Sequence, residues 1–357
     1  MPPPGRSCTS TGAITRSAPD QSAVSDDDEG NAVLLLSFGG PEGPEDVLPF
    51  LENVTRGRDI PRERLLSVAE HYQHFGGVSP INEQNRGLRK AIENEMSLRG
   101  RPLPVYWGNR NWPPLVEDVV ARMAADGINR AVAIATSAYS SASGCRQYHE
   151  DIARARQATG PTAPAIDKLP HFFDHPGFIT ANADGLSAAL TRLPAGMADQ
   201  ARIVATAHSI PMSMARAAGP QGGLYEQQLR STARAVVDAV DHGRTVDLVW
   251  QSRSGPPQVP WLEPDINEHL IRLAAEGVPA VVLSPIGFVS DHIEVLWDLD
   301  TEARETAAAH DLVLERAATA GTHPAFVALI ADLVEERLAG GPRTLGTICP
   351  AGCCLAG

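Results

Sequence analysis

The sequence lacks an apolar run long enough to cross a bilayer, and it lacks an excess of basic residues. A spanning helix needs roughly 20 consecutive apolar residues, and no stretch of the 357-residue chain approaches that length. The formal net charge is −13, whereas binding a nucleic-acid backbone needs clustered Lys and Arg. We therefore expect no membrane-spanning segment and no nucleic-acid partner.

The first thirty residues lack both hydrophobic periodicity and the apolar centre of a signal peptide. Residues 1–30 are rich in Pro, Ser, Thr and Asp, and they end in the acidic run Asp26-Asp-Asp-Glu29. This composition predicts a disordered tail. The missing signal peptide predicts a cytoplasmic protein.

Cysteine is scarce and unevenly placed. Cys8 lies in the expected tail and Cys145 in mid-chain, while Cys349, Cys353 and Cys354 crowd the last nine residues. An adjacent pair and a short gap at one end do not make a disulfide framework for a chain of this size. The spacing favours metal or cluster ligation, with a four-cysteine zinc site or incidental surface thiols as alternatives.

Apolar runs of strand length alternate with helical patterns from residue 31 onward. Such near-continuous runs are typical of strands that are buried on both faces of a parallel sheet. The runs form two series of four, so we expect an α/β fold with two similar lobes, each a parallel sheet flanked by helices. The expected strands cover 32–38, 103–108, 130–136, 163–169, 201–207, 246–251, 280–284 and 312–316. The expected helices cover 83–98, 113–126, 145–158, 177–192, 223–241, 264–276, 292–309 and 323–338.

A histidine follows the fifth expected strand. Ligands of such sheets bind beyond the carboxyl ends of the strands, and His208 stands at that position. A neutral imidazole there can bind a divalent metal or accept a proton. A histidine that only makes a structural hydrogen bond is the alternative.

Carboxylates follow the seventh expected strand. Glu294, Asp298 and Glu302 recur every four residues on the expected helix, which would place them on one face as a ridge suited to the passage of Fe²⁺. Two plainer explanations remain open. Asp291 and Glu294 also match a helix capping box, and the ridge could be a solvated surface.

Five ordered segments resemble those of the ferrochelatase family. The two signature segments are His208-Ser-Ile-Pro211 and Gly287-Phe-Val-Ser-Asp-His-Ile-Glu294. The other matching segments are Leu36-Ser-Phe-Gly-Gly-Pro41, Gly76-Gly-Val-Ser-Pro-Ile81, and Trp250-Gln-Ser-Arg-Ser-Gly255 with Pro260-Trp-Leu262. The resemblance runs from about residue 31 to residue 338.

The resemblance implies two chelatase-type, Rossmann-like lobes with a porphyrin cleft between them. It implies a disordered tail at 1–30, an N-terminal lobe at 31–170, a C-terminal lobe at 171–320, a final helix at 321–340 packing back on the first lobe, and a cysteine-rich segment at 341–357. His208 and Glu294 fall on the family's paired catalytic residues, which contact Fe²⁺ and take up pyrrole protons. Which residue does which stays open. Asp298 and Glu302 would form an outer metal site.

The resemblance also implies porphyrin contacts at Phe38, Arg56, Tyr72, Ser79 and Tyr148. Related bacterial enzymes often carry a Tyr where this chain has Phe38, and a Phe side chain cannot ligate iron. Phe38 is therefore expected to stack on the porphyrin ring. Each of the five has a plainer alternative as a surface Arg, core Tyr or turn Ser.

Some members of the family hold a [2Fe-2S] cluster on one mid-chain cysteine and three near the C-terminus. The resemblance thus implies a cluster on Cys145, Cys349, Cys353 and Cys354, which meet the ligand count of four thiolates. Fe²⁺ itself would be a substrate.

The lip of the implied cleft points to coproporphyrin III as the substrate. The segment 48–77 carries Arg56, Arg58, Asp59, Arg62, Glu63 and Arg64. Such a wetted rim suits four propionates and argues against stable membrane association. Protoporphyrin IX is the alternative substrate, and a cobalt chelatase or a non-catalytic heme or iron–sulfur sensor are alternative functions. A monomer is expected.

Overall fold

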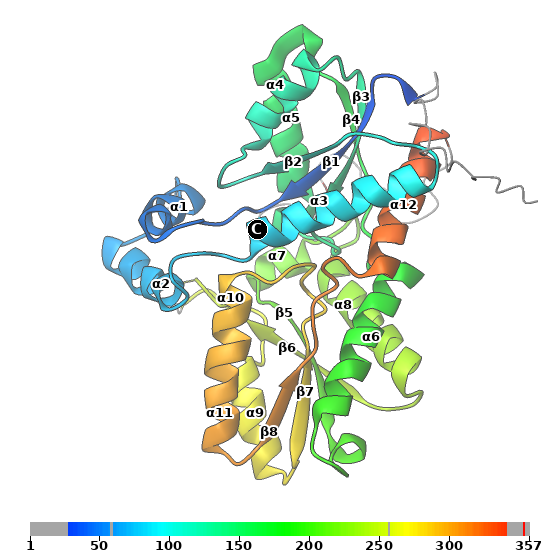
Figure 1. Ribbon diagram of the computed structural model, residues 1–357. Helices are drawn as coiled ribbons and strands as arrows, with labels where there is room; N and C mark the ends of the chain where they lie inside the picture. The colour runs from blue at the N-terminus through cyan, green and yellow to red at the C-terminus, as the bar shows by residue number, and fades with distance from the viewer. Residues whose placement is uncertain (1–27, 58–59, 256–257, 341–352, 354–357) are drawn as a thin grey trace, which may run out of the picture.

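Two parallel four-stranded sheets form the frame of the molecule (Figure 1). The computed structural model describes residues 28–57, 60–255, 258–340 and 353. Strand order is β2-β1-β3-β4 in the first sheet and β6-β5-β7-β8 in the second, so the two sheets repeat one topology. The strands are β1 (Asn31–Ser37), β2 (Val105–Asn109), β3 (Arg130–Ala135), β4 (Ala165–Lys168), β5 (Arg202–His208), β6 (Val246–Gln251), β7 (Ala280–Ser284) and β8 (Val313–Arg316). The expected α/β fold with two similar parallel sheets is confirmed.

Helices cover both faces of each sheet. In the first half these are α1 (Val47–Val54), α2 (Arg62–His74), α3 (Ile81–Leu98), α4 (Val116–Ala125) and α5 (Gln147–Thr159). In the second half they are α6 (Pro176–Arg192), α7 (Met212–Arg216), α8 (Leu224–Val240), α9 (Ile266–Ala275), α10 (Ile293–Val295), α11 (Ala303–Ala309) and α12 (Pro324–Leu338). Short 3₁₀ turns cover Pro44–Asp46, Gly160–Thr162 and Ala198–Gln200.

The central strands are apolar because no face of them meets water. Every residue from Ala32 to Leu36 in β1 is at most 1% exposed, and β1 pairs in parallel with both β2 and β3. When helices cover both faces of a strand, the residues on both faces are apolar and do not alternate with polar ones. This is why the strand boundaries could be predicted closely.

Several expected helices differ in detail. Helix α4 begins at Val116, so Pro113 and Pro114 precede it rather than open it. The segment expected as one helix from 292 to 309 is broken into α10, a π-helix at Leu296–Glu302, and α11. A second π-helix, Ala142–Arg146, leads into α5. Helices α1, α2 and α7 were not predicted.

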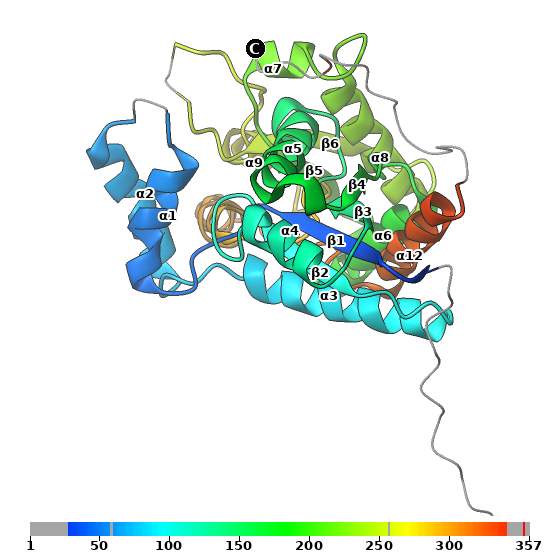
Figure 2. The same cartoon turned by 90° about the horizontal axis from the view of Figure 1, so that it is seen from above.

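The last helix joins the two halves. Figures 1 and 2 show α12 beside α3 of the first half and α6 of the second. Arg99, at the end of α3, binds Asp332 at 2.6 Å and Glu335 at 2.9 Å, both on α12. The rings of Phe178 on α6 and Phe326 on α12 lie 5.9 Å apart between centroids. A continuous apolar core therefore runs between the sheets.

The described chain begins in ordered structure at Asp28, before the expected end of the tail. Asp28 is 3% exposed, and Arg101 donates two hydrogen bonds to its carboxylate. No helix in the described ranges is long and apolar enough to span a bilayer.

Candidate active site

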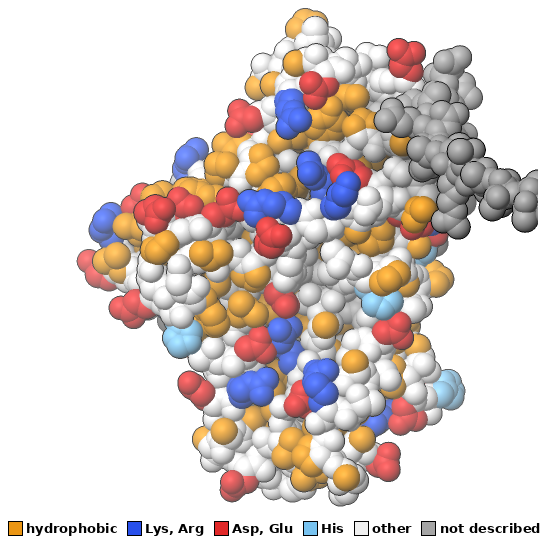
Figure 3. Space-filling view, in the orientation of Figure 1, with side chains coloured by type: hydrophobic (Ala, Val, Ile, Leu, Met, Phe, Trp, Pro, Cys, Tyr) orange, Lys and Arg blue, Asp and Glu red, His pale blue; other side chains and the backbone are white. Residues whose placement is uncertain are grey.

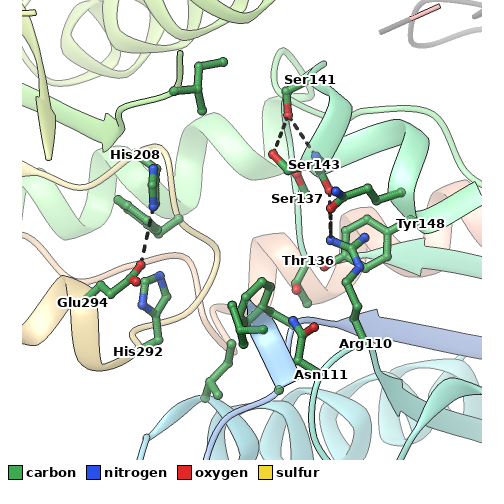
Figure 4. Close-up of a pocket in the computed structure, with 18 of the residues that line it drawn as sticks. Arg110, Asn111, Thr136, Ser137, Ser141, Ser143, Tyr148, His208, His292 and Glu294 are labelled. Atoms are coloured by element: carbon green, nitrogen blue, oxygen red, sulfur yellow. Dashed lines mark hydrogen bonds and ion pairs between the residues drawn. The ribbon is translucent and has the colours of Figure 1, made fainter. Parts of the chain in front are cut away.

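A cavity of about 890 Å³ opens between the two sheets at the carboxyl ends of their strands (Figure 4). His208 and Glu294 both line it. The five residues expected to contact a porphyrin also line it, namely Phe38, Arg56, Tyr72, Ser79 and Tyr148. Asp298, Glu302 and Cys145 are not among the lining residues.

His208 and Glu294 face each other in this cavity (Figure 4). His208 is the last residue of β5, and Glu294 lies in α10. The distance from Nε2 of His208 to Oε2 of Glu294 is 3.5 Å. The other ring nitrogen, Nδ1, donates to the backbone carbonyl of Ser209. With Nδ1 occupied, Nε2 is the nitrogen that faces the cavity for proton or metal exchange.

The close approach of the two loops depends on a glycine. A Cβ at Gly287 would stand 2.6 Å from the Cα of Ala207, next to His208. Any larger residue would push the segment after β7 away from the end of β5. Gly287 thus allows His208 and Glu294 to come within reach of each other.

The contact between the two side chains shifts the pKa values of both. Enclosure alone would raise the pKa of Glu294, but the contact with His208 and the nearby His292 and His71 lower that pKa to about 2. Enclosure alone would lower the pKa of His208, but the contact with Glu294 raises it above its ordinary value. An opposite charge at this distance favours the ionised form of both partners.

A second histidine, His292, lies beside Glu294 in the same wall (Figure 4). Burial lowers its pKa, so the ring stays neutral at neutral pH. The sequence reasoning assigned His292 no role, although it lies inside the segment Gly287–Glu294.

The acidic residues after Glu294 occupy the π-helix Leu296–Glu302. The carboxylate of Asp298 accepts hydrogen bonds from Ser252 and, at 3.3 Å, from Gln251 at the end of β6. Burial, helped by the negative charges of Glu294 and Glu302, raises the pKa of Asp298 to about 7. Glu302 accepts a hydrogen bond from the indole of Trp297 at 2.9 Å. Asp298 is thus half-buried, with its carboxylate held by Ser252 and Gln251.

The capping-box explanation for Asp291 is wrong. The N-cap residue of α10 is His292, not Asp291, and no side chain caps that end. Asp291 instead accepts a hydrogen bond from Arg316 at 3.1 Å. A partner 25 residues further along the chain takes the place of the local cap.

The first-lobe wall of the cavity carries polar and charged side chains. Arg110 follows β2 and binds Asp151 at 2.6 Å. Its guanidinium lies 4.1 Å from the ring centroid of Tyr148. Burial raises the pKa of Tyr148, which therefore keeps its phenolic proton at neutral pH. The hydroxyls of Ser137, Ser141 and Ser143 complete the wall (Figure 4).

Arg110 was missed in the sequence, although a signal existed. It stands one residue beyond the carboxyl end of β2, where ligands of parallel sheets are expected. The position beyond a strand end that indicated His208 therefore also indicates Arg110.

The mouth of the cavity is bordered by α1 and α2. Phe38 is 39% exposed, and its ring packs edge-on against Phe50 of α1 at 6.2 Å. Phe50 in turn lies 5.9 Å from Tyr72 of α2. Figure 3 shows acidic, basic and apolar side chains interspersed over these two helices, so the rim is mixed in character.

Two of the cysteines expected to hold a cluster are described. Cys145 lies in the π-helix Ala142–Arg146 and is 5% exposed, and Cys353 is half-buried. Cys349 and Cys354, like Cys8, lie outside the described residues. Within the described ranges, no group of three or more His, Cys, Asp or Glu side chains is arranged to hold a metal ion.

Known proteins resemble this chain along most of its length. The family model Ferrochelatase matches residues 30–338. The coproporphyrin III ferrochelatase of Nocardia farcinica is 57% identical over 333 residues, covering 91% of this chain and 94% of that protein. The protein of the same name from Mycolicibacterium smegmatis is 58% identical over 312 residues, covering 87% and 91%. That from Streptomyces coelicolor is 52% identical over 351 residues, covering 91% and 93%.

Among solved structures, SirB from Bacillus subtilis with Fe³⁺ aligns with a TM-score of 0.53 at 12% sequence identity. The alignment covers 87% of this chain and 97% of SirB. At this identity the likeness concerns the fold.

Proposed function

The chain belongs to the ferrochelatase family, and from that premise we propose that it inserts Fe²⁺ into coproporphyrin III with release of two protons. The observation that carries the proposal is the pair His208–Glu294, which faces a cavity lined by aromatic, hydroxyl and basic side chains. The relatives named for this activity cover most of the chain.

Metal insertion needs both a proton acceptor and an anionic oxygen near the porphyrin nitrogens. Two pyrrole protons must leave as Fe²⁺ enters. Glu294, whose pKa is held low, offers a carboxylate to the cation. A divalent cation beside Glu294 lowers the pKa of His208, so that the Nε2 proton passes to water. Nε2 can then accept the two pyrrole protons one after the other and release each of them to water. The two residues then act as one unit.

The cavity wall of the first lobe would hold the macrocycle. Phe38 at the mouth presents an exposed ring for stacking on the porphyrin. Arg56, Ser79 and Tyr148 offer donors for propionates, and Tyr72 offers a ring. A bound porphyrin that is bent rather than flat would expose its nitrogen lone pairs, so tighter binding of the bent form would accelerate insertion.

We favour coproporphyrin III over protoporphyrin IX because the rim carries charged side chains and the first-lobe wall is polar. Arg62 and Glu52 on the rim are 65% and 50% exposed and lie 3.3 Å apart. A rim of this kind suits a tetracarboxylate substrate and argues against stable membrane association. We also propose that the protein is a cytoplasmic monomer. Asp298 and Glu302 would form an outer metal site on the approach to Glu294.

We further propose the division of the folded chain into lobes at 31–170 and 171–320, with 321–340 completing the first. The ion pairs from Arg99 to α12 support this assignment of the last helix.

A [2Fe-2S] cluster on Cys145, Cys349, Cys353 and Cys354 is the remaining part of the proposal. Four thiolates are the donor set that such a cluster takes. The burial of Cys145 beside α5 fits a ligand that is shielded from solvent. The cluster would link the end of the chain to the first lobe.

The test is a steady-state assay of the purified protein with Fe²⁺ and coproporphyrin III, protoporphyrin IX or sirohydrochlorin, and with Co²⁺ in place of Fe²⁺. We expect the highest kcat/KM for Fe²⁺ with coproporphyrin III. A preference for protoporphyrin IX would overturn the substrate. A preference for Co²⁺ and sirohydrochlorin, or no turnover at all, would overturn the function.

A further inference from the structure

One arginine holds both ends of the segment that carries Glu294. Arg316 is the last residue of β8, and its side chain is 13% exposed. Its Nε and Nη2 atoms donate to the two carboxylate oxygens of Asp300 at 2.8 and 2.9 Å. Its Nη1 and Nη2 atoms also donate to Asp291 at 3.1 and 3.4 Å. A planar guanidinium matches such paired contacts, whereas a lysine ammonium cannot.

The two carboxylates bracket the reacting residue. Asp291 lies three residues before Glu294, in the segment after β7, and Asp300 lies six residues after it, in the π-helix. Between these two anchors the chain forms α10 and the first part of the π-helix, including Asp298. The position of Glu294 is therefore set from both sides by one side chain.

The bracketed segment needs such support. A π-helix is less favourable than an α-helix and persists where its surroundings hold it. Glu294, Asp298 and Glu302 also bring like charges together, which favours loosening of the turn. Asp291 is anchored a second time, because its backbone N–H donates to Gln84 of α3 in the first lobe at 2.9 Å.

We infer that Arg316 is a positioning residue for metal insertion: by holding Asp291 and Asp300 together it fixes α10 and the π-helix that follows, and so directs Glu294 toward the incoming cation. The inference rests on the proposed iron insertion. Arg316 touches neither substrate, since it does not line the cavity.

The test compares Arg316→Lys and Asp300→Asn with a matched control, Arg99→Lys. Arg99 also links several carboxylates from a partly buried position, but it joins α3 to α12 away from the cavity. For each variant, kcat and the KM values for Fe²⁺ and for coproporphyrin III are measured, together with Tm and coproporphyrin III binding from the Soret shift.

We expect Arg316→Lys to raise the KM for Fe²⁺ or lower kcat, so that kcat/KM for Fe²⁺ falls about tenfold or more. The KM for coproporphyrin III should stay within about twofold, because the first-lobe wall is untouched. Asp300→Asn should change kcat/KM in the same direction. The double variant should be little worse than Arg316→Lys alone, since both changes break one contact. Arg99→Lys should lower Tm without changing either KM.

The inference fails if Arg316→Lys and Asp300→Asn lower Tm as Arg99→Lys does while leaving kcat/KM for Fe²⁺ within about twofold of the wild type. Arg316 would then be a structural ion pair only. If Arg316→Lys does not fold, Asp300→Asn decides on the same criterion. A wild-type protein that does not insert iron would reject the proposed function instead, so the two failures are distinguishable.

Discussion

The two halves of the molecule repeat one sheet topology and place different chemistry at the same positions. β1 and β5 are equivalent central strands, as the strand orders show. β1 leads into the exposed ring of Phe38, whereas β5 ends in His208. The first half lines the cavity with rings, hydroxyls and an arginine neutralised by Asp151, and the second half supplies the imidazole–carboxylate pair. One half is built to hold a ligand and the other to react with it, on the same frame.

The equivalent strands β3 and β7 are each followed by a π-helix, and the two are stabilised differently. In Ala142–Arg146, the hydroxyl of Ser141 accepts the backbone N–H of Gly144 at 2.9 Å, so the turn is capped locally. In Leu296–Glu302, the support comes from Arg316 on another strand. The first π-helix therefore combines a local cap with a tertiary contact, from Arg110 to the backbone carbonyl of Ser143 at 3.3 Å, whereas the second is held by the paired contact of Arg316 with Asp300.

The largest expected effect on activity comes from removing the imidazole of His208. His208→Ala should lower kcat by about 10³-fold, because the proton acceptor is lost while the binding wall remains. Porphyrin binding, followed by the Soret shift, should be retained. Near-normal turnover by this variant would show that the second half does not carry the reaction.

Glu294→Gln should have the next largest effect. The amide keeps the shape of the side chain but offers no charge to Fe²⁺, so kcat/KM for Fe²⁺ should fall about 10²-fold. The KM for coproporphyrin III should change little. If the KM for coproporphyrin III changed more than kcat/KM for Fe²⁺, Glu294 would have to be assigned to porphyrin binding instead.

Arg56→Ala tests the role of the first half in binding the porphyrin. Loss of this charge at the cavity should raise the KM for coproporphyrin III about fivefold, and the KM for the dipropionate protoporphyrin IX less. The kcat should be nearly unchanged, since Arg56 is not part of the reacting pair. Equal effects on both porphyrins would argue against a propionate contact at this position.

Cys145→Ser tests whether the first half also holds a cluster. Visible absorption should bleach and Tm should fall by several degrees, since the cluster closes a loop of about two hundred residues. The kcat should change much less than in His208→Ala. Cys8→Ser is the matched control and should change neither absorption nor Tm. A colourless wild-type protein with one zinc per chain would replace the cluster with a zinc site.

The smallest expected effect is a pH dependence of stability. The lowered pKa of Glu294 means that its ionised form stabilises the fold above its ordinary value of 4.5 and that this contribution is lost as pH falls toward 2. The raised pKa of His208 means that its contribution is present below its ordinary value of 6.5 and is lost as pH rises through the folded pKa. The Tm difference between wild type and Glu294→Gln should therefore be largest between these two pH values. A difference that grows in alkali would contradict the ion pair.

The sequence predicted the strands well and the special turns poorly, for a physical reason. Central strands such as β1 and β7 are continuous apolar runs because both of their faces are buried, and that signal is local. Helix α2 was missed because Tyr72 is its one buried residue, which leaves almost no apolar face to detect. The π-helix Leu296–Glu302 could not be predicted, because the contact of Arg316 with Asp300 joins two elements of the fold.

The sequence predicted individual residues of the candidate site but not all of their contacts in space. His208 and Glu294 were expected to meet, and they do. Arg110 and His292 were given no role, and Asp291 was assigned a local alternative. Arg110 and Asp291 have partners that are distant in sequence, Asp151 and Arg316, and spacing along the chain does not reveal such contacts.

The position of α12 bears on how the protein is made. The helix is the last described element of the fold, yet its partners include Arg99, which is 233 residues away from Asp332. During synthesis, the apolar faces of α3 and α6 are therefore made long before the helix that covers them. Contacts of such long sequence separation form slowly, and the uncovered surface is open to aggregation until they form. We expect the nascent chain to need shielding until α12 has emerged from the ribosome.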